Sequence, residues 1–390
     1  MRSRFAAFES RQSLSRYDEH SHNQCSQRTR QLLKGVCMDA GGHACRLLDA
    51  CAASARPKIA IFRAMHLGEM LCAVPVFRAL RTALPAADIT LIGLPWASSF
   101  AKRFSQYIDS HVAFPGFPGL PGQPVDLPRL PGFIADMQQQ KFDCVLQMHG
   151  SGALTNPLIR TFNAARNAGY YRQGDYCPDP LHFMPWDESQ HDILRLARLM
   201  AFLGVPVSSL ELEFPLAEAD WQALRAGHSA LPAAGSYVCI HPGARLPAQR
   251  WPAAHFAEVA DSLSAEGLQV VLVGSSQERG IAAAVQSHMA GPALNLAGTL
   301  GLGAFAALLA QARLVICNDT GIAHIAAALH TPSLALSRDG GARRWAPLDR
   351  RRHRSVDSAA AEPGCRHSSA STLVMRRVRE LLDDTGMPLA

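Results

Sequence analysis

Short, all-apolar runs alternate with longer helical patterns along most of this chain. Four runs have the length and composition of strands buried on both faces of a parallel sheet: 59–62, 88–93, 237–241 and 314–317. A polar loop and then a stretch predicted to be helical follow the runs 59–62, 237–241 and 314–317. The first such helix is predicted over Glu69 to Leu84, where Pro75 either kinks it or marks its first turn. This alternation predicts an α/β protein with right-handed crossovers.

The strand and helix pattern occurs twice, with a restart around Pro215 to Gly235. We therefore expect two Rossmann-like domains that face each other across a cleft, over residues 57–220 and 221–390. Residues 1–56 lack a periodic apolar pattern, and we interpret them as a disordered N-terminal extension. The last helix, Leu373 to Asp384, is expected to pack back on the N-terminal domain.

One stretch breaks the alternation. Residues 114–133 hold six prolines and four glycines, which is typical of an extended surface loop.

Composition narrows the class of protein. The chain is 48% hydrophobic and 18% charged, as in soluble globular proteins, and no apolar run approaches the ~18 residues of a membrane span. Without the apolar core of a signal peptide at the N-terminus, a cytoplasmic location is expected. The ten cysteines lack paired spacing, which favours reduced thiols over disulfides or a zinc site.

Charge argues against nucleic acid as a partner. The net charge is +6, and residues 1–56 hold nine basic against five acidic residues, so the rest is nearly balanced. A modest attraction of this extension to anionic membrane surfaces is compatible with that distribution.

The most informative polar group is Asn-Asp-Thr-Gly at 318–321, between a buried strand and an alanine-rich helix. The amides of Thr320 and Gly321 would be free at the helix N-terminus, where the helix dipole favours an anion such as a diphosphate. His324 in the first turn could add a hydrogen bond to a phosphate oxygen. Alternatively, Asp319 or Thr320 merely caps the helix, and His324 is an ordinary buried histidine.

Asp-Thr-Gly is also a signature of aspartic proteases, and a second copy stands at 384–386. The helix-forming segment after the first copy and the charged helix before the second make that interpretation unfavourable.

Three stretches together resemble the glycosyltransferases of family 9, the heptosyltransferases of lipopolysaccharide inner-core synthesis and their relatives. They are KIAIFRAMHLGEMLCAVPVFRALRTALPAADITLIG (58–93), IHPGARLPAQRWPAAHFAEVADSLSAEGLQVVLVGSSQE (240–278) and NDTGIAHIAAALHTP (318–332). Of the three, the third stretch is the one that is specific to this family. The resemblance runs from about Lys58 to Asp384 and implies a GT-B architecture, a nucleotide-activated sugar donor, inversion at the anomeric carbon, and neither metal nor cofactor.

The resemblance also implies a catalytic base. In the family, an acidic residue after a glycine in the first loop takes the proton from the acceptor hydroxyl, and here that residue is Glu69 where Asp is usual. Alternatively, Glu69 is only an acid favoured at a helix N-terminus.

Further residues match the donor-binding positions of the family. Glu278 matches the acid that holds the ribose hydroxyls, although it would also suit the start of a helix, and Asp319 matches the residue that contacts hydroxyls of the donor sugar. The family has a lysine where this chain has Gln249, and Arg250 or Arg245 would replace its charge.

The resemblance therefore implies transfer of a sugar, a heptose from ADP-heptose in the first place, onto a lipopolysaccharide-core-type or other cell-surface glycan acceptor. The glycolipid or glycan acceptor would lie at the inner membrane surface, with the enzyme cytoplasmic and peripheral to that membrane. The alternatives are a family member that uses another nucleotide sugar, a degenerate sugar-nucleotide binder without catalysis, and a GT-B sugar-nucleotide epimerase. Transfer, binding alone and interconversion of the free donor would distinguish them.

Overall fold

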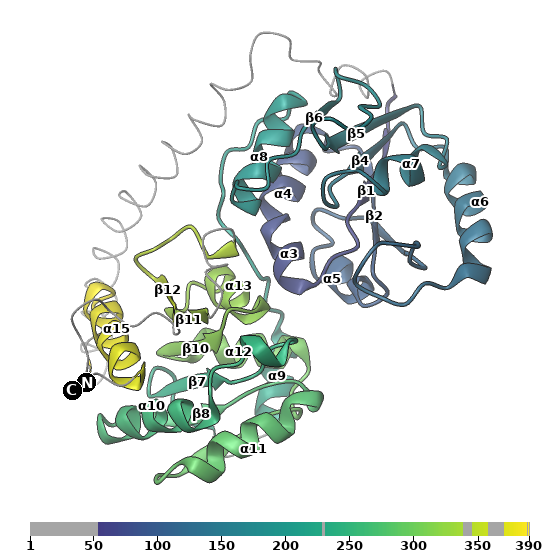
Figure 1. Ribbon diagram of the computed structural model, residues 1–390. Coiled ribbons are helices and arrows are strands. Elements are labelled where there is room, and N and C mark those ends of the chain that lie inside the picture. Colours follow the sequence, from purple (N-terminus) through teal and green to yellow (C-terminus); the bar gives the residue numbers. More distant parts are fainter. Residues whose placement is uncertain (1–53, 228–230, 338–344, 358–369, 388, 390) are drawn as a thin grey trace, which may run out of the picture.

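The chain folds into two lobes, each built on a parallel sheet of six strands (Figure 1). The structure is a computed structural model, and it describes residues 54–390 except 228–230, 338–344, 358–369, 388 and 390. The predicted extension over 1–56 thus lies almost wholly outside the described residues.

The N-terminal lobe has the strand order β3-β2-β1-β4-β5-β6. Its strands are β1 (Lys58–Phe62), β2 (Asp88–Gly93), β3 (Ser110–Ala113), β4 (Cys144–Gln147), β5 (Arg166–Tyr171) and β6 (Phe183–Pro185). Its helices are α3 (Leu67–Cys72), α4 (Val74–Ala83), α5 (Ala97–Arg103), η1 (Leu127–Arg129), α6 (Leu130–Gln140), α7 (Thr155–Arg160) and α8 (Asp192–Phe202).

The C-terminal lobe has the strand order β12-β11-β10-β7-β8-β9. Its strands are β7 (Tyr237–His241), β8 (Gln269–Leu272), β9 (Ala293–Asn295), β10 (Leu314–Asn318), β11 (Ser333–Ser337) and β12 (His353–Asp357). Its helices are α9 (Glu218–Gly227), η2 (Pro247–Gln249), α10 (Ala253–Ala265), η3 (Ser276–Glu278), α11 (Arg279–His288), α12 (Leu302–Gln311), α13 (Gly321–Ala328) and α15 (Ala370–Asp384).

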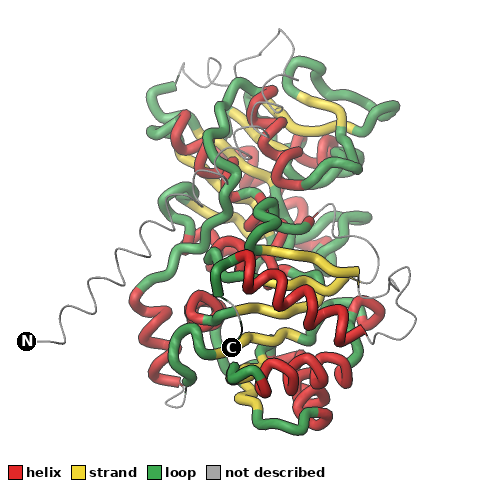
Figure 2. Tube along the Cα trace, turned by 90° about the vertical axis from the view of Figure 1, so that its left-hand side faces the viewer, coloured by secondary structure: helices red, strands yellow, loops and turns green. Residues whose placement is uncertain are grey.

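Both sheets follow the same doubly wound order, which confirms the predicted pair of Rossmann-like units. Figure 2 shows the strands of each sheet with helices packed around them. In this topology the strand order reverses beside the first strand, between β1 and β4 in one lobe and between β7 and β10 in the other. Ligands of such sheets bind beyond the carboxyl ends of the strands at these points. The loops after these four strands are therefore the expected place of a ligand site.

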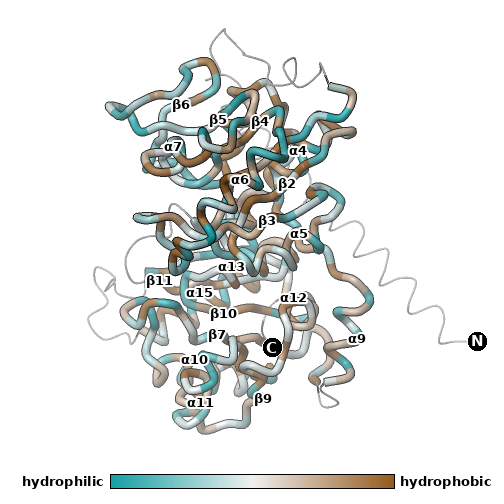
Figure 3. Tube along the Cα trace, turned by 90° about the vertical axis from the view of Figure 1, so that its right-hand side faces the viewer, coloured by the Kyte–Doolittle hydropathy of each residue, from teal (hydrophilic) through white to brown (hydrophobic). Residues whose placement is uncertain are grey.

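Each sheet is buried on both faces, as the all-apolar runs predict. In β1, Ile59 and Ile61 pack with Phe77 of α4, whereas Ala60 and Phe62 pack on the opposite face. Hydrophilic segments lie mainly on peripheral loops, for example beside β6 (Figure 3).

Two predicted elements differ from the structure because of proline. The helix expected over 69–84 is two helices, α3 and α4, which meet at Ala73, and Pro75 lies in the first turn of the second. The stretch 114–133 is a loop only in part, since η1 begins at Leu127 and α6 at Leu130. Proline is compatible with a first helical turn because the amide that it lacks would have no partner there.

The last helix does not pack as expected. We predicted that it returns to the N-terminal domain, but α15 packs on α10 and β12 of the C-terminal lobe. Its apolar stripe, with Val374 and Val378, joins the core that includes Val259 and Leu263 of α10. The apolar stripe that was expected to close the cleft instead shares a core with β7 and β10 of its own lobe.

Candidate functional site

The first loop of the N-terminal lobe meets the C-terminal lobe in a contact of glycine with glycine. Gly68 lies in the first turn of α3 after β1, and Gly321 is the first residue of α13 after β10. A Cβ on Gly68 would lie 3.0 Å from the Cα of Gly321, and one on Gly321 would lie 3.2 Å from the amide nitrogen of Gly68. The first loop of the N-terminal lobe and the Asn-Asp-Thr-Gly loop therefore form one place in the structure, although 253 residues separate them.

Glu69, the predicted base, lies in the first turn of α3 and is partly exposed. Its backbone carbonyl accepts a hydrogen bond of 2.6 Å from the guanidinium of Arg63. Arg63 is itself buried at the end of β1 and forms an ion pair with Asp192. The sequence did not single out Arg63 or Asp192. A charged residue directly after an all-apolar strand was the available signal for Arg63.

Thr320 occupies the N-cap position of α13, but its side chain makes no capping hydrogen bond. Its Oγ1 is buried and has no hydrogen-bond partner among the residues that the structure describes. Asp319, Thr320 and Gly321 are each partly exposed. The simple capping alternative therefore does not account for Thr320, and the anion-binding role of this loop stays a prediction.

Asn318 holds the loop in place. It is fully buried, its Oδ1 accepts from the amide of Trp251 at 2.9 Å, and its Nδ2 donates to the carbonyls of Pro242 and Gly243. One amide side chain thus ties the end of β10 to both ends of the loop after β7. Asn318 belonged to the motif, but no role followed for it from the sequence.

His324 lies in the contact between the lobes. Its imidazole is buried, with Nδ1 3.7 Å from the sulfur of Cys72, and its Cδ2 would be 2.9 Å from a Cβ on Gly68. Burial lowers the pKa of His324 to about 4, so the ring is neutral at pH 7. These contacts favour the alternative of a packed histidine, and a hydrogen bond from His324 to a phosphate stays a prediction.

Glu278 is held by three hydrogen bonds on one carboxylate oxygen. Oε2 accepts from His241 Nε2 at 3.2 Å and from the amide and hydroxyl of Ser275 at 2.8 Å each. The bond from His241 is the main reason that the pKa of Glu278 falls to about 2. Oε1 faces Gly243, where an added Cβ would lie only 1.9 Å away. Glu278 therefore completes a capping box, and its role toward a ribose stays a prediction.

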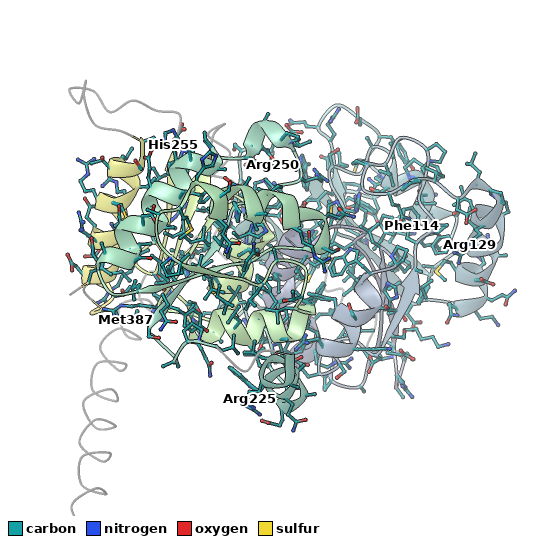
Figure 4. The ribbon with its side chains drawn as sticks, turned by 90° about the horizontal axis from the view of Figure 1, so that it is seen from below. Phe114, Arg129, Arg225, Arg250, His255 and Met387 are labelled. Atoms are coloured by element: carbon teal, nitrogen blue, oxygen red, sulfur yellow. The ribbon has the colours of Figure 1, made fainter. Side chains whose placement is uncertain are left out.

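The loop after β7 carries the predicted substitutes for the family lysine. Arg245 is exposed and donates across the lobes to Nε2 of His66 at 3.1 Å, three residues before Glu69. Arg250 is partly buried and donates to the carbonyl of Ala244 in its own loop, and Gln249 is partly exposed. Figure 4 shows Arg250 on the side of the C-terminal lobe toward the other lobe, with Met387 at the far side. Arg245 is thus the cation that this loop brings to the first loop.

Another hydrogen bond joins the lobes. His191, directly before α8, donates from Nε2 to the carbonyl of Ala346 at 2.7 Å, and burial lowers the pKa of this histidine. By the resemblance, this chain departs from the family pattern at Ser337 to Gly341, and Arg343 and Arg344 would belong to the rim of the donor-sugar site. Most of these residues fall within 338–344, outside the described residues.

Two features are absent from the described ranges. None of their helices combines the length and apolar character that a membrane crossing needs. Within the same ranges, no three His, Cys, Asp or Glu side chains are grouped as a metal site would need.

Comparison with known proteins agrees with this geometry. Residues 133–372 match the model of the family described as glycosyltransferase family 9 (heptosyltransferase). A lipopolysaccharide heptosyltransferase 2 of Salmonella typhimurium is 27% identical over 292 residues, which cover 72% of this chain and 82% of that protein.

Two solved structures share the fold. A family 9 glycosyltransferase from Veillonella parvula has a TM-score of 0.69 at 20% identity and covers 84% of this chain and 98% of its own. The ADP-heptose lps heptosyltransferase II of E. coli has a TM-score of 0.63 at 18% identity, with 84% and 99% covered. The predicted GT-B arrangement is thereby confirmed. On these matches, the chain belongs to glycosyltransferase family 9, the heptosyltransferases, and is a glycosyltransferase of that type.

Proposed function

We propose that this enzyme transfers a heptose from ADP-heptose to a lipopolysaccharide-core-type acceptor, with inversion and without a metal ion. The observation that carries the proposal is the contact of Gly68 with Gly321, because it brings the turn that carries Glu69 next to the N-terminus of α13. The donor identity is supported by the E. coli neighbour, whose name specifies ADP-heptose. The acceptor class is supported by the Salmonella relative, which is a lipopolysaccharide heptosyltransferase.

The proposed chemistry divides between the lobes. Glu69 takes the proton from the acceptor hydroxyl as its oxygen attacks the anomeric carbon from the face opposite the diphosphate, which inverts the configuration. The leaving ADP carries its charge on the diphosphate. The amides of Thr320 and Gly321 and the cations of Arg245 and Arg250 offset that charge without a metal ion.

The donor would be held by the C-terminal lobe. Oε2 of Glu278 takes part in the capping box, so Oε1 is the oxygen that would accept hydrogen bonds from the ribose hydroxyls. Asp319 would face the hydroxyls of the sugar. We assign the acceptor to the N-terminal domain, residues 57–220, and the donor to residues 221–390. The enzyme would meet its glycolipid acceptor in the cytoplasm at the inner membrane, which co-sedimentation with acceptor-bearing vesicles tests.

The base is tested by Glu69→Gln. This change keeps the shape of the side chain and removes its ability to accept a proton, so turnover should fall by about 10²–10⁴-fold with donor affinity nearly unchanged. Glu188→Gln, on an exposed acid of the same lobe, is the control and should leave turnover unchanged. Near-normal turnover of Glu69→Gln would exclude the assignment.

Donor and stereochemistry need a separate measurement. Purified enzyme is incubated with ADP-heptose or with UDP-, GDP- and dTDP-sugars, and the anomeric configuration of the product is read by NMR. We expect transfer from ADP-heptose that persists in a chelator. Binding without transfer or hydrolysis would instead support the degenerate binder.

A further inference from the structure

Three buried charged side chains lie behind the first loop. Arg63, Asp192 and Arg195 are 2%, 3% and 1% exposed. Arg63 follows β1, Asp192 is the first residue of α8, and Arg195 is one turn further along that helix. Asp192 binds both guanidinium groups, that of Arg63 at 2.9 Å, so the group carries one net positive charge inside the N-terminal lobe.

The guanidinium of Arg63 joins separate elements. Its Nη1 donates to the carbonyl of Met148 after β4 at 2.6 Å, and its Nη2 donates to the carbonyl of Glu69 at 2.6 Å and to Asp192. A planar group with several fixed donors can serve such divergent acceptors at once, whereas the ammonium of lysine cannot match that geometry.

The carbonyl of Glu69 needs this external donor. Helix α3 has only six residues, and the last four carbonyls of a helix have no partner within it. The amide of Ala73, which would be the regular partner of Glu69, bonds instead to the carbonyl of Met70 at 3.0 Å. Arg63 therefore completes the backbone of the turn that presents Glu69.

Stability alone is a weak reason for this arrangement. Buried ion pairs are often no better for stability than apolar side chains of similar volume. Arg195 is anchored separately, with its guanidinium 3.7 Å from the ring of Trp186 and a donor on the carbonyl of Asp187. Asp192 is thus fixed from one side by Arg195, and it fixes Arg63 on the other.

We propose that Arg63, held by Asp192, is a positioning residue that sets the orientation of the Glu69 turn for proton transfer. This inference rests on the proposed role of Glu69 as base. Since Arg63 is buried and contacts the backbone of Glu69 rather than substrate, it acts on the rate of transfer and leaves donor binding intact.

The test is a double-mutant cycle between Arg63→Lys and Glu69→Gln. Arg63→Lys keeps the buried charge but loses the planar guanidinium with its several fixed donors. We expect kcat to fall about 10- to 100-fold with the donor KM unchanged, because a small misplacement of a catalytic group has an effect of this size. Arg78→Lys is the matched control, because Arg78 also pairs with an acid, Glu213 at 3.0 Å, and donates to two backbone carbonyls away from Glu69. It should leave kcat unchanged.

The cycle separates positioning from general damage. If Arg63 acts through Glu69, adding Arg63→Lys to Glu69→Gln lowers kcat little further. An equal loss with and without the Glu69 carboxylate would overturn the positioning role, as would full kcat in Arg63→Lys when Glu69→Gln is impaired. Full turnover of Glu69→Gln itself would remove the proposed base and this inference with it.

Discussion

Gly68→Ala is the sharpest perturbation of the contact between the lobes. The backbone of Gly68 lies outside the left-handed region, so alanine causes no backbone strain there and suits the helix better than glycine. The added methyl, however, would lie 2.9 Å from Cδ2 of His324 and 3.0 Å from Cα of Gly321. Neither neighbour is the end of a flexible chain, so the two lobes must separate slightly to accept the methyl.

The magnitude follows from known overpacking. An extra methyl group in a well-packed contact costs about 1–3 kcal/mol. Because each 1.4 kcal/mol is a factor of ten, the population with the two loops in contact should fall by about 5- to 150-fold. If transfer needs Glu69 and α13 in contact, kcat/KM falls by the same factor while each lobe stays folded.

Steady-state transfer and thermal unfolding decide the matter together. Gly132→Ala in α6 is the control, since a Cβ there would meet nothing within 4 Å. We expect it to leave kcat/KM unchanged. Unchanged kcat/KM in folded Gly68→Ala, or an equal fall in Gly132→Ala, would refute the reasoning that the glycine contact brings the two halves of the site together.

Two further predictions concern Glu278 and the buried histidines. Gly243→Ala should displace the carboxylate of Glu278 and weaken ADP and donor binding in calorimetry by about 10-fold or more, whereas Gly280→Ala, where a Cβ meets nothing within 4 Å, should not. Burial lowers the pKa of His149 and of His324 from 6.5 to about 4. The unfolded chain therefore binds more protons between these pH values, and the unfolding free energy should fall as pH drops from 6.5 to 4, by up to about 3 kcal/mol per histidine. His149→Asn, which keeps an acceptor for the Ala64 amide, should reduce that slope in denaturant unfolding at several pH values, and an unchanged slope would contradict the assignment.

Most strands that lie between two neighbours could be predicted from sequence, whereas β5 and the edge strands could not. The run 237–241 matches β7 residue for residue, because a strand between two neighbours is apolar on both faces. The edge strands β3 and β12 read Ser-His-Val-Ala and His-Arg-Ser-Val-Asp, and both are only partly buried. Short runs with polar residues resemble loops, and their strand form depends on the neighbouring strand, which no local pattern reveals.

The helix-forming residues at the start of α6 were hidden by proline and glycine. The sequence Leu-Pro-Gly at 130–132 was included in the predicted loop, yet it forms the first turn of the helix. Proline and glycine mark positions where a helix can begin as well as positions where a helix ends.

For the candidate site too, some features follow from the local sequence, and others depend on contacts between residues far apart in the chain. The role expected for Thr320 came from its place between a strand end and a helix, and the role expected for Glu278 came from the resemblance to family 9. The structure has Thr320 at the N-cap of α13 and Glu278 in η3, and both roles stay predictions. His324 shows the limit of that reasoning. Its place in the first turn of α13 predicts a hydrogen bond to a phosphate oxygen. In the structure, however, the face of the helix that carries His324 lies against Cys72 and Gly68 of the other lobe. A histidine is equally suited to both surroundings, and only the contact between distant loops decides which one it has.

The same contact explains why small residues occur on both sides of the junction. A short helix presents free amides only at its first turn, so a reaction centre built from two such turns needs them close together. Side chains at the point of contact would hold the turns apart, and glycine at both 68 and 321 removes that obstacle. The proposed chemistry is then left to the neighbouring positions, Glu69 on one lobe and Thr320 on the other, and both residues are partly exposed. On the proposed roles, glycine at the centre of the contact and polar side chains at its edge meet one requirement, that the proposed base and the proposed anion-binding helix end act on the same small molecule.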